Sequence, residues 1–268
     1  MLVVIKGAGD LASGVAVRLH RAGIGVVMTD LERPTAIRRE VSFCRAISEG
    51  EARVEDVGAR RAYSPEQALA LTREGWVAVL VDPQAACVAA LKPDAVVDAI
   101  LAKRNTGTKR GDAPVVVALG PGFAAGEDCD AVVETMRGHD LGRVYLTGSA
   151  LPNTGVPGEV GGQTILRLLR APADGTFREA KHIGDFVRAG EAVAYVDDAP
   201  VTAGLDGVIR GLLPTGTPVD GGMKCGDIDP RGVRESCYTV SDKARAIGGG
   251  VLEALLALWG TLRETSGI

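Results

Sequence analysis

The first residues whose types and spacing suggest chemistry form a glycine-rich turn near the start of the chain. Residues 2–6 read LVVIK, an apolar run typical of a strand, and GAGDLASG follows. The turn fits the pattern G-x-G-x-x-G/A through Gly7, Gly9 and Ala12, and Asp30 lies about 20 residues beyond it, where a ribose-binding acid is expected. The glycines allow a tight turn and a close approach of ligand, and the following helix presents free N–H groups to an anion. This spacing predicts a dinucleotide site.

One residue within the turn opposes that interpretation. The carboxylate of Asp10 would repel a diphosphate, unless it caps the helix or binds a metal or a hydroxyl group instead. The alternative is that Gly7 and Gly9 only form a tight connection between a strand and a helix, with no dinucleotide bound.

Further chemistry-bearing residues follow the other predicted strands. Near-continuous apolar runs predict parallel strands over 24–30, 76–81, 95–100, 114–119 and 143–148. Because ligands of open α/β sheets bind beyond the carboxyl ends of the strands, the loops there form one candidate pocket for an anionic ligand. A solvated charged rim is the alternative. Besides the turn and Asp30, the candidate cofactor-binding residues in these loops are Arg38, Lys103, Arg104, Asn105, Gly120 and Gly122.

A second group of candidates, treated as catalytic, lies in the segment GDIDPRGVRESC. Asp227 and Asp229 are two residues apart, so on a strand they share a face and could hold a divalent metal or position a base. A surface acidic pair is the alternative. Cys237 lies near Arg234 and Lys243, and these cations predict a lowered thiol pKa and a role as nucleophile or sulfur acceptor. No metal is assigned from the sequence.

Two helices are marked by their termini. Ser64-Pro65-Glu66-Gln67 is a capping box with proline at the first helical position, and it predicts a helix through about residue 73. A second helix is expected to begin at Asp242, and the three glycines at 248–250 are expected to interrupt it.

Residues 171–197 and 203–229 are an internal repeat. The two segments align at a fixed offset of 32, and eight of the 27 pairs are identical, where composition alone would give roughly 2. Most matched residues are turn formers, so the repeat predicts one small β-unit used twice.

The repeat resembles the biotinyl and lipoyl domains, which are flattened barrels of two quasi-symmetric halves. In those domains a modified lysine lies on the hairpin that joins the halves. Here the joining segment, 197–200, reads DDAP, and the only similar motif, GMKCG, falls at the end of the second copy. The resemblance therefore implies a barrel-sandwich hybrid without a swinging arm.

Composition limits the class of protein. The chain has 268 residues, a formal net charge of −4 and 46% hydrophobic residues, which is typical of a soluble globular protein and argues against nucleic acid as a partner. No apolar run approaches the roughly 20 residues that span a bilayer, so no membrane partner is expected. The first residues resemble a strand rather than a signal peptide, and the five scattered cysteines form no CxxC pair. A cytoplasmic location is the expectation.

Several longer segments together resemble the bacterial YqeB family of accessory proteins. They include IKGAGDLASGVAVRLHRAG, RPTAIRREVSF, AKRNTG, ALGPGFAAG, PNTGVPGEVGG and SDKARAIGGGVLEA. The resemblance runs over nearly the whole chain. It implies a role in maturing a selenium-dependent molybdenum hydroxylase, and it makes that enzyme or its maturation factors the expected protein partner.

The combined expectation is an α/β protein of three regions. A Rossmann-like, mostly parallel sheet domain occupies 1–165, the barrel-sandwich hybrid repeat 166–230, and a C-terminal loop and helix 231–268. The expected function is binding of a phosphorylated cofactor, either molybdenum cofactor in its pterin dinucleotide form or NAD(P). An NAD(P)-dependent oxidoreductase and a non-catalytic scaffold are the alternatives, and both an enzymatic activity and a homo-oligomer stay open.

Overall fold

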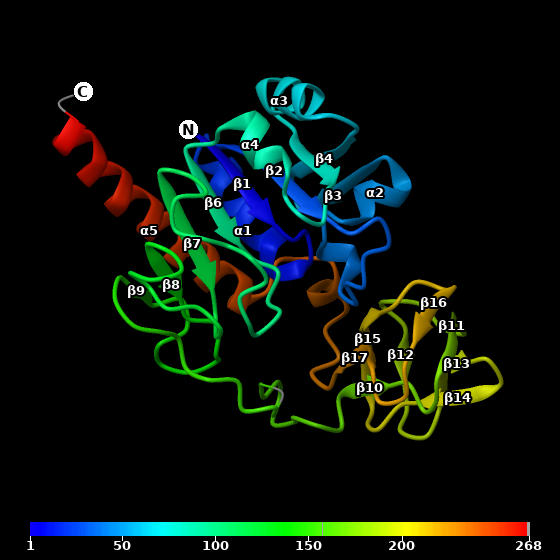
Figure 1. The fold of residues 1–268 in the computed structure, drawn as a ribbon. Coiled ribbons are helices and arrows are strands. Elements are labelled where there is room, and N and C mark those ends of the chain that lie inside the picture. Colours follow the sequence, from blue (N-terminus) through cyan, green and yellow to red (C-terminus); the bar gives the residue numbers. More distant parts are fainter. Residues whose placement is uncertain (157, 267–268) are drawn as a thin grey trace. The chain divides into compact units, whose positions relative to one another are not determined.

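The computed structural model describes residues 1–156 and 158–266, and it divides into two compact units (Figure 1). The first unit takes Met1–Pro34, Ser42–Thr154 and the residues from Val240 onward, and the second takes Thr35–Val41 and Gly155–Thr239. Neither unit is continuous in the chain. The short segment 35–41 joins the second unit through the backbone, where the Leu212 amide donates to the Ile37 carbonyl at 2.9 Å.

A nine-stranded sheet forms the centre of the first unit. Its strand order is β3-β4-β5-β2-β1-β6-β7-β8-β9; all neighbours from β4 to β8 run parallel, and the edge strands β3 and β9 pair antiparallel. The large mostly parallel sheet is thus confirmed. The strands are β1 (Leu2–Lys6), β2 (Gly25–Asp30), β3 (Glu51–Val54), β4 (Val57–Ala62), β5 (Val77–Val81), β6 (Ala95–Asp98), β7 (Val115–Leu119), β8 (Ala131–Val133) and β9 (Val144–Tyr145).

The apolar runs located β1, β2, β5, β6 and β7, and the other strands differ from the prediction. The short parallel strand β8 was not expected. The run at 143–148 forms only the two-residue strand β9, which pairs antiparallel with β8 rather than parallel. The hairpin of β3 and β4 was not expected, because its sequence EARVEDVGARRA is rich in charge. Its outer strand alternates exposed and buried residues, as an edge strand does.

Helices cover both faces of this sheet. α1 (Asp10–Arg21) packs on β1 and β2 and lies beside α5 (Asp242–Ser266), which also contacts β7, β8 and β9 (Figure 1). α3 (Pro65–Arg73) packs with α4 (Cys87–Leu91) against the buried layer of Val4, Val27, Ala78 and Val96. The predicted cap of α3 is confirmed, since the Gln67 amide donates to the Ser64 hydroxyl at 3.2 Å. The remaining short helices are α2 (Arg45–Glu49), η1 (Arg39–Val41) and η2 (Arg234–Cys237).

The glycines at 248–250 do not interrupt the last helix, so that expectation was wrong. α5 is continuous from Asp242. A Cβ on Gly250 would lie 2.1 Å from the Gly142 carbonyl oxygen, and one on Gly248 would lie 3.2 Å from the Gly14 carbonyl oxygen of α1. These positions therefore permit close packing of the helix on its neighbours, and that packing offsets the low intrinsic helix propensity of glycine.

The second unit consists of two antiparallel sheets of four strands each. Their orders are β10-β17-β15-β12 and β14-β13-β11-β16. Between them lies a core that includes Phe177, Val193, Ile209, Leu212 and Ile228. The strands are β10 (Leu168–Arg170), β11 (Gly175–Glu179), β12 (Phe186–Val187), β13 (Ala192–Val196), β14 (Ala199–Thr202), β15 (Gly207–Leu212), β16 (Thr217–Val219) and β17 (Lys224–Asp229).

The two sequence repeats fold as the same unit of strands, as predicted. β11, β12 and β13 of the first copy correspond at the offset of 32 to β15, β16 and β17 of the second. The copies also exchange strands, because β12 pairs with β15 and β16 pairs with β11. Each sheet therefore contains strands of both copies, and neither copy would bury its apolar face alone.

Within the part of the chain that the structure describes, no helix is long and apolar enough to cross a membrane.

Candidate functional site

The strand order places a candidate site at the carboxyl edge of the large sheet. β1 lies between β2 and β6. The chain continues from β1 to β2 on one side and from β6 to β7 on the other, so the direction in which strands are added reverses between β1 and β6. In open α/β sheets the ligand crevice lies at such a point, beyond the carboxyl ends of the strands. The residues that follow β1, β2, β6 and β7 are therefore the candidates for binding a ligand.

The glycine turn after β1 is tightly held by the protein itself. Gly7 has φ +97°, and a Cβ there would lie 2.9 Å from the Ala99 carbonyl oxygen, so its lack of a side chain lets the segment after β6 approach. The Asp30 carboxylate accepts the Ala8 amide at 2.9 Å and the Leu31 amide at 2.7 Å. Burial raises the pKa of Asp30 against the effect of these two hydrogen bonds. Asp30 thus fixes the turn, and part of the backbone hydrogen-bonding capacity of the turn is already used.

Two other predicted residues of the turn lie at the start of α1. Gly9 is the N-cap residue in an extended conformation, and Asp10 is the first residue of the helix, where a carboxylate interacts favourably with the helix dipole. Ala12 is almost completely buried and belongs to the core. The turn therefore has the expected backbone arrangement, with a carboxylate already at the end of the helix where a phosphate would bind.

A buried polar network at the ends of β1 and β6 was not predicted. The ammonium group of Lys6 donates to the Thr108 hydroxyl at 2.9 Å and pairs with Asp112 at 3.1 Å. The Thr108 hydroxyl in turn donates to the Asp98 carboxylate at 2.5 Å, and that carboxylate also accepts the Ile100 amide. Lys6 and Asp98 are the last residues of their strands. The network binds the loop after β6 to the edge of the sheet.

The segment 99–104 runs from the first glycine turn to a second one after β7. A Cβ on Gly122 would lie 2.6 Å from the Arg104 Cα, while Gly120 packs against Thr135 in the same way. Two non-glycine residues of the segment, Leu101 and Lys103, have positive φ, which costs about 1–2 kcal/mol for each such residue. Strained backbone of this kind is concentrated at functional sites.

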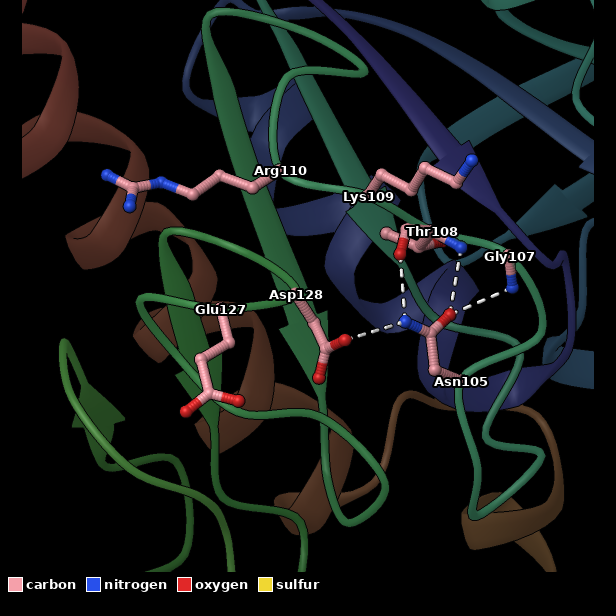
Figure 2. A pocket seen from close by; sticks show the side chains of 7 residues that line it. All are labelled: Asn105, Gly107, Thr108, Lys109, Arg110, Glu127 and Asp128. Carbon is pink, nitrogen blue, oxygen red and sulfur yellow. Dashed lines mark hydrogen bonds between the residues drawn. The ribbon is translucent and has the colours of Figure 1, made fainter.

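A pocket of about 490 Å³ opens between the loops that follow β6 and β7 (Figure 2). Asn105 organises its wall, because its side-chain oxygen accepts the Gly107 and Thr108 amides and its nitrogen donates to the Thr108 carbonyl and to Asp128. Lys109 and Arg110 extend in opposite directions (Figure 2), and Arg110 pairs with Asp130. The lining residues are Asn105, Gly107, Thr108, Lys109, Arg110, Glu127 and Asp128.

The candidates of the first unit are therefore near one another along a single edge. Asn105 lines the pocket, and Gly122 packs on the segment that carries Lys103 and Arg104. Arg38 belongs to the second unit instead, where its guanidinium donates to the Ser236 and Thr239 carbonyls at 3.1 and 3.5 Å. The acids Glu127 and Asp128 of the β7 loop, which also line the pocket, had no individual signal in the sequence.

Asp227 and Asp229 lie in the second unit on the same face of β17, as their spacing of two residues predicted. That face is buried inside the unit. Asp227 pairs with Arg167 and Arg210, and Asp229 pairs with Arg210 and Arg231. The exposed fractions of the two acids are 2% and 0%. Burial opposes ionisation of Asp229, but hydrogen bonds from Arg231 and the charge of Arg210 outweigh it and lower the pKa of this carboxyl. The alternative of a surface acidic pair is therefore wrong, and the proposed role of the two acids in catalysis stays a prediction.

Cys237 is buried and its Sγ donates weakly to the Ile209 carbonyl at 3.5 Å. Burial raises the pKa of this thiol despite the nearby cations Arg38 and Arg210, opposite to the lowering expected from the sequence. All five cysteines are free and buried. Among the described residues, no group of three or more His, Cys, Asp or Glu side chains is placed to hold a metal ion.

The chain is similar to a known protein over nearly its whole length. No family model matches the chain. The chain is 54% identical over 257 residues to the uncharacterized protein YqeB of Escherichia coli (strain K12); the match covers 96% of the chain and 48% of that protein. A crystal structure of an aspartoacylase family protein from Mesorhizobium loti aligns at 13% identity over 85% of the chain and 84% of that structure, with a TM-score of 0.28, a value too low to indicate a shared fold. The chain thus spans about half the length of the curated relative it matches, and over that half the expected resemblance to YqeB is confirmed.

Proposed function

We propose that the first unit is a Rossmann-like domain that binds a small phosphorylated ligand at the carboxyl edge of its sheet. The observation that carries this proposal is the pocket of about 490 Å³ between the loops after β6 and β7, beside the switch strand β1. Its volume falls within the roughly 300–1,000 Å³ typical of ligand sites. Thr108 lines the pocket and also belongs to the buried network with Lys6 and Asp98, so the pocket wall is anchored to the sheet.

The charges along this edge suit a ligand with both an anionic and a hydroxyl-bearing part. Lys103, Arg104 and Lys109 are exposed cations whose side chains have no ion-pair partner among the described residues. Asp30 at the end of β2 is half-buried and directed at the glycine turn, where a carboxylate can accept hydrogen bonds from hydroxyl groups. Nucleotides and pterin phosphates have this combination of groups.

The second unit supports a more specific proposal about its fold. Two interlocked four-stranded sheets built from a repeated unit are the arrangement expected of a barrel-sandwich hybrid. The hairpin that joins the copies contains Asp197 and Asp198 and no lysine, so a covalently attached cofactor has no acceptor there. We propose that this unit is a non-carrier relative of the biotinyl and lipoyl domains.

The biological role proposed for the chain is in maturing a selenium-dependent molybdenum hydroxylase, and it rests on the sequence resemblance alone. Molybdenum cofactor fits the phosphate-binding part of the proposal through its pterin phosphate. The described residues offer no cluster of metal ligands, so a molybdenum ion would be held by the cofactor's own ligands rather than by side chains of this chain. When bound, the group would supply the metal centre that the hydroxylase uses.

Isothermal titration calorimetry of the full chain tests the proposed binding with three classes of probe: NADH and NADPH, ADP, and a pterin phosphate. At least one probe is expected to bind with a Kd below about 100 μM. Asp30→Asn is expected to weaken that binding about tenfold, because a carboxylate hydrogen bond to a hydroxyl group is lost. Asp82→Asn is the matched control, since Asp82 directly follows β5 and also accepts two backbone amides, at 3.0 and 2.8 Å. Failure of every probe would refute the proposal.

The maturation role needs a separate test. Native mass spectrometry with elemental analysis of chain purified from a host that makes molybdenum hydroxylases is expected to show a bound pterin, together with molybdenum or selenium. Protein that carries none of these under such conditions would contradict the role while leaving the binding proposal intact. Binding of NADH or NADPH with exclusion of pterin would instead favour the oxidoreductase alternative.

A further inference from the structure

The glycine turn of the first unit is poorly placed to receive a phosphate group. Its neighbourhood contains two carboxylates, Asp10 in the first turn of α1 and Asp30 at the end of β2. The Ala8 amide already donates to Asp30, and Gly7 accommodates the Ala99 carbonyl rather than open space. A phosphate bound here would be repelled by these two carboxylates. It would also find fewer free backbone N–H donors than a helix N-terminus usually offers.

Backbone N–H groups at the pocket also already have hydrogen-bond partners within the protein. The amides of Gly107 and Thr108 donate to the Asn105 side-chain oxygen. Arg110 pairs with Asp130, and its guanidinium also donates to the Gly126 carbonyl at 3.2 Å. Phosphate recognition in this region must therefore come mainly from side-chain cations that have no partner.

Lys103 and Arg104 meet this requirement. Both are exposed, and neither side chain has a hydrogen-bond or ion-pair partner within the described residues. Their backbone is fixed, because Lys103 has φ +63° and a Cβ on Gly122 would lie 2.6 Å from both the Arg104 Cα and its amide nitrogen. The same segment begins at Ala99 and Ile100, against the Gly7 turn. Two cations are thus presented from a rigid segment between the two glycine turns, next to Asn105 of the pocket.

We propose that Lys103 and Arg104 bind the phosphate or diphosphate of the ligand, and that the glycine turn with Asp10 and Asp30 binds its hydroxyl- or amino-bearing part. The proposal rests on the ligand binding proposed above and specifies its orientation. A guanidinium beside an ammonium group is a combination that recognises phosphate oxygens, through paired N–H donors and a point charge. Asp10, which opposes a diphosphate on the turn, then becomes an acceptor for the opposite end of the ligand.

The test uses inorganic pyrophosphate as the probe, titrated into the full chain at low ionic strength by calorimetry. Wild-type chain is expected to bind it, and Lys103→Ala combined with Arg104→Ala is expected to weaken the Kd about tenfold or more. The charge-preserving pair Lys103→Arg and Arg104→Lys is expected to restore most of the affinity. The matched control is Arg73→Ala with Lys92→Ala, because these exposed residues lie at the opposite edge of the sheet and Lys92, like Lys103, has positive φ.

A further variant distinguishes the two ends of the site. Asp10→Asn is expected to change pyrophosphate affinity less than about twofold; a large gain would place the phosphate on the glycine turn and overturn the proposal. Unchanged pyrophosphate affinity in the Lys103/Arg104 double variant would also overturn it, while ligand binding at the edge would stand. If neither pyrophosphate nor any nucleotide or pterin probe binds, the proposed function fails and this inference with it. Circular dichroism of each variant confirms that the chain is folded.

Discussion

Replacing Thr108 by valine removes one hydroxyl group while keeping the shape of the side chain. That hydroxyl accepts from the ammonium of Lys6 at 2.9 Å and donates to the Asp98 carboxylate at 2.5 Å, and Thr108 is 2% exposed. A hydrogen bond to a charged group contributes about 1.5–3 kcal/mol. Two such bonds are lost, but Lys6 keeps its ion pair with Asp112 and Asp98 keeps the hydrogen bond from the Ile100 amide, so each charged group retains one partner. We expect the free energy of unfolding of the first unit to fall by about 2–4 kcal/mol.

Urea unfolding followed by tryptophan fluorescence measures this effect, because Trp76 and Trp259 both lie in the first unit. With a urea slope of about 2 kcal/mol/M, the midpoint is expected to fall by about 1–2 M. Hydrogen exchange should also accelerate over residues 100–112, which the network binds to the sheet. Thr29→Val is the control: Thr29 is buried at 3%, and its hydroxyl bonds no other described residue. If both variants lose the same stability, the network does not anchor the loop.

Other consequences follow from the buried charges and thiols. Arg210→Met should lower the free energy of unfolding of the second unit by about 3–5 kcal/mol, because it removes one partner from two buried acids. Arg143→Met, which breaks an exposed ion pair, should lower that of the first unit by at most about 1 kcal/mol. Equal losses in urea unfolding would contradict this difference. The folded pKa of Asp229 lies below the ordinary value of 3.8, so the stability that its carboxylate contributes is complete above about pH 4 and is lost as the pH falls through the folded pKa. The melting temperature of the Asp229→Asn variant should therefore decrease less below pH 4 than that of the wild type. Burial raises the pKa of Cys44 to about 12, and that of Cys237 in the same direction, so a disulfide reagent at pH 8 should label neither thiol until urea is added; rapid labelling of Cys237 in the folded chain would revive its role as a nucleophile.

Local patterns in the sequence located most elements of the fold. The capping box at Ser64 predicted the start of α3, and the apolar runs predicted β1, β2, β5, β6 and β7, because both signals come from residues adjacent in the chain. The glycines of α5 were misleading for the same reason. Their effect depends on Gly14 of α1 and on Gly142, which approach the helix only after folding.

For the candidate site, the sequence correctly indicated the edge of the sheet but not its chemistry. Asn105 was identified and lines the pocket. Lys6, Asp98 and Thr108 were missed because each is an ordinary residue in its own segment, and their hydrogen bonds join positions up to 102 residues apart.

The sequence by itself determined the central strands of the large sheet, the glycine turn, the twofold β-repeat and the resemblance to YqeB. These properties follow from spacing along one chain. Only the tertiary structure decided which charges are already neutralised. It showed that Asp227 and Asp229 are held by buried arginines, that the glycine turn is occupied by Asp30 and the segment after β6, and that Lys103 and Arg104 have no such partner within the described residues. The physical reason is that a charge is neutralised by whichever group lies within a few ångströms of it, and those distances are set by the fold.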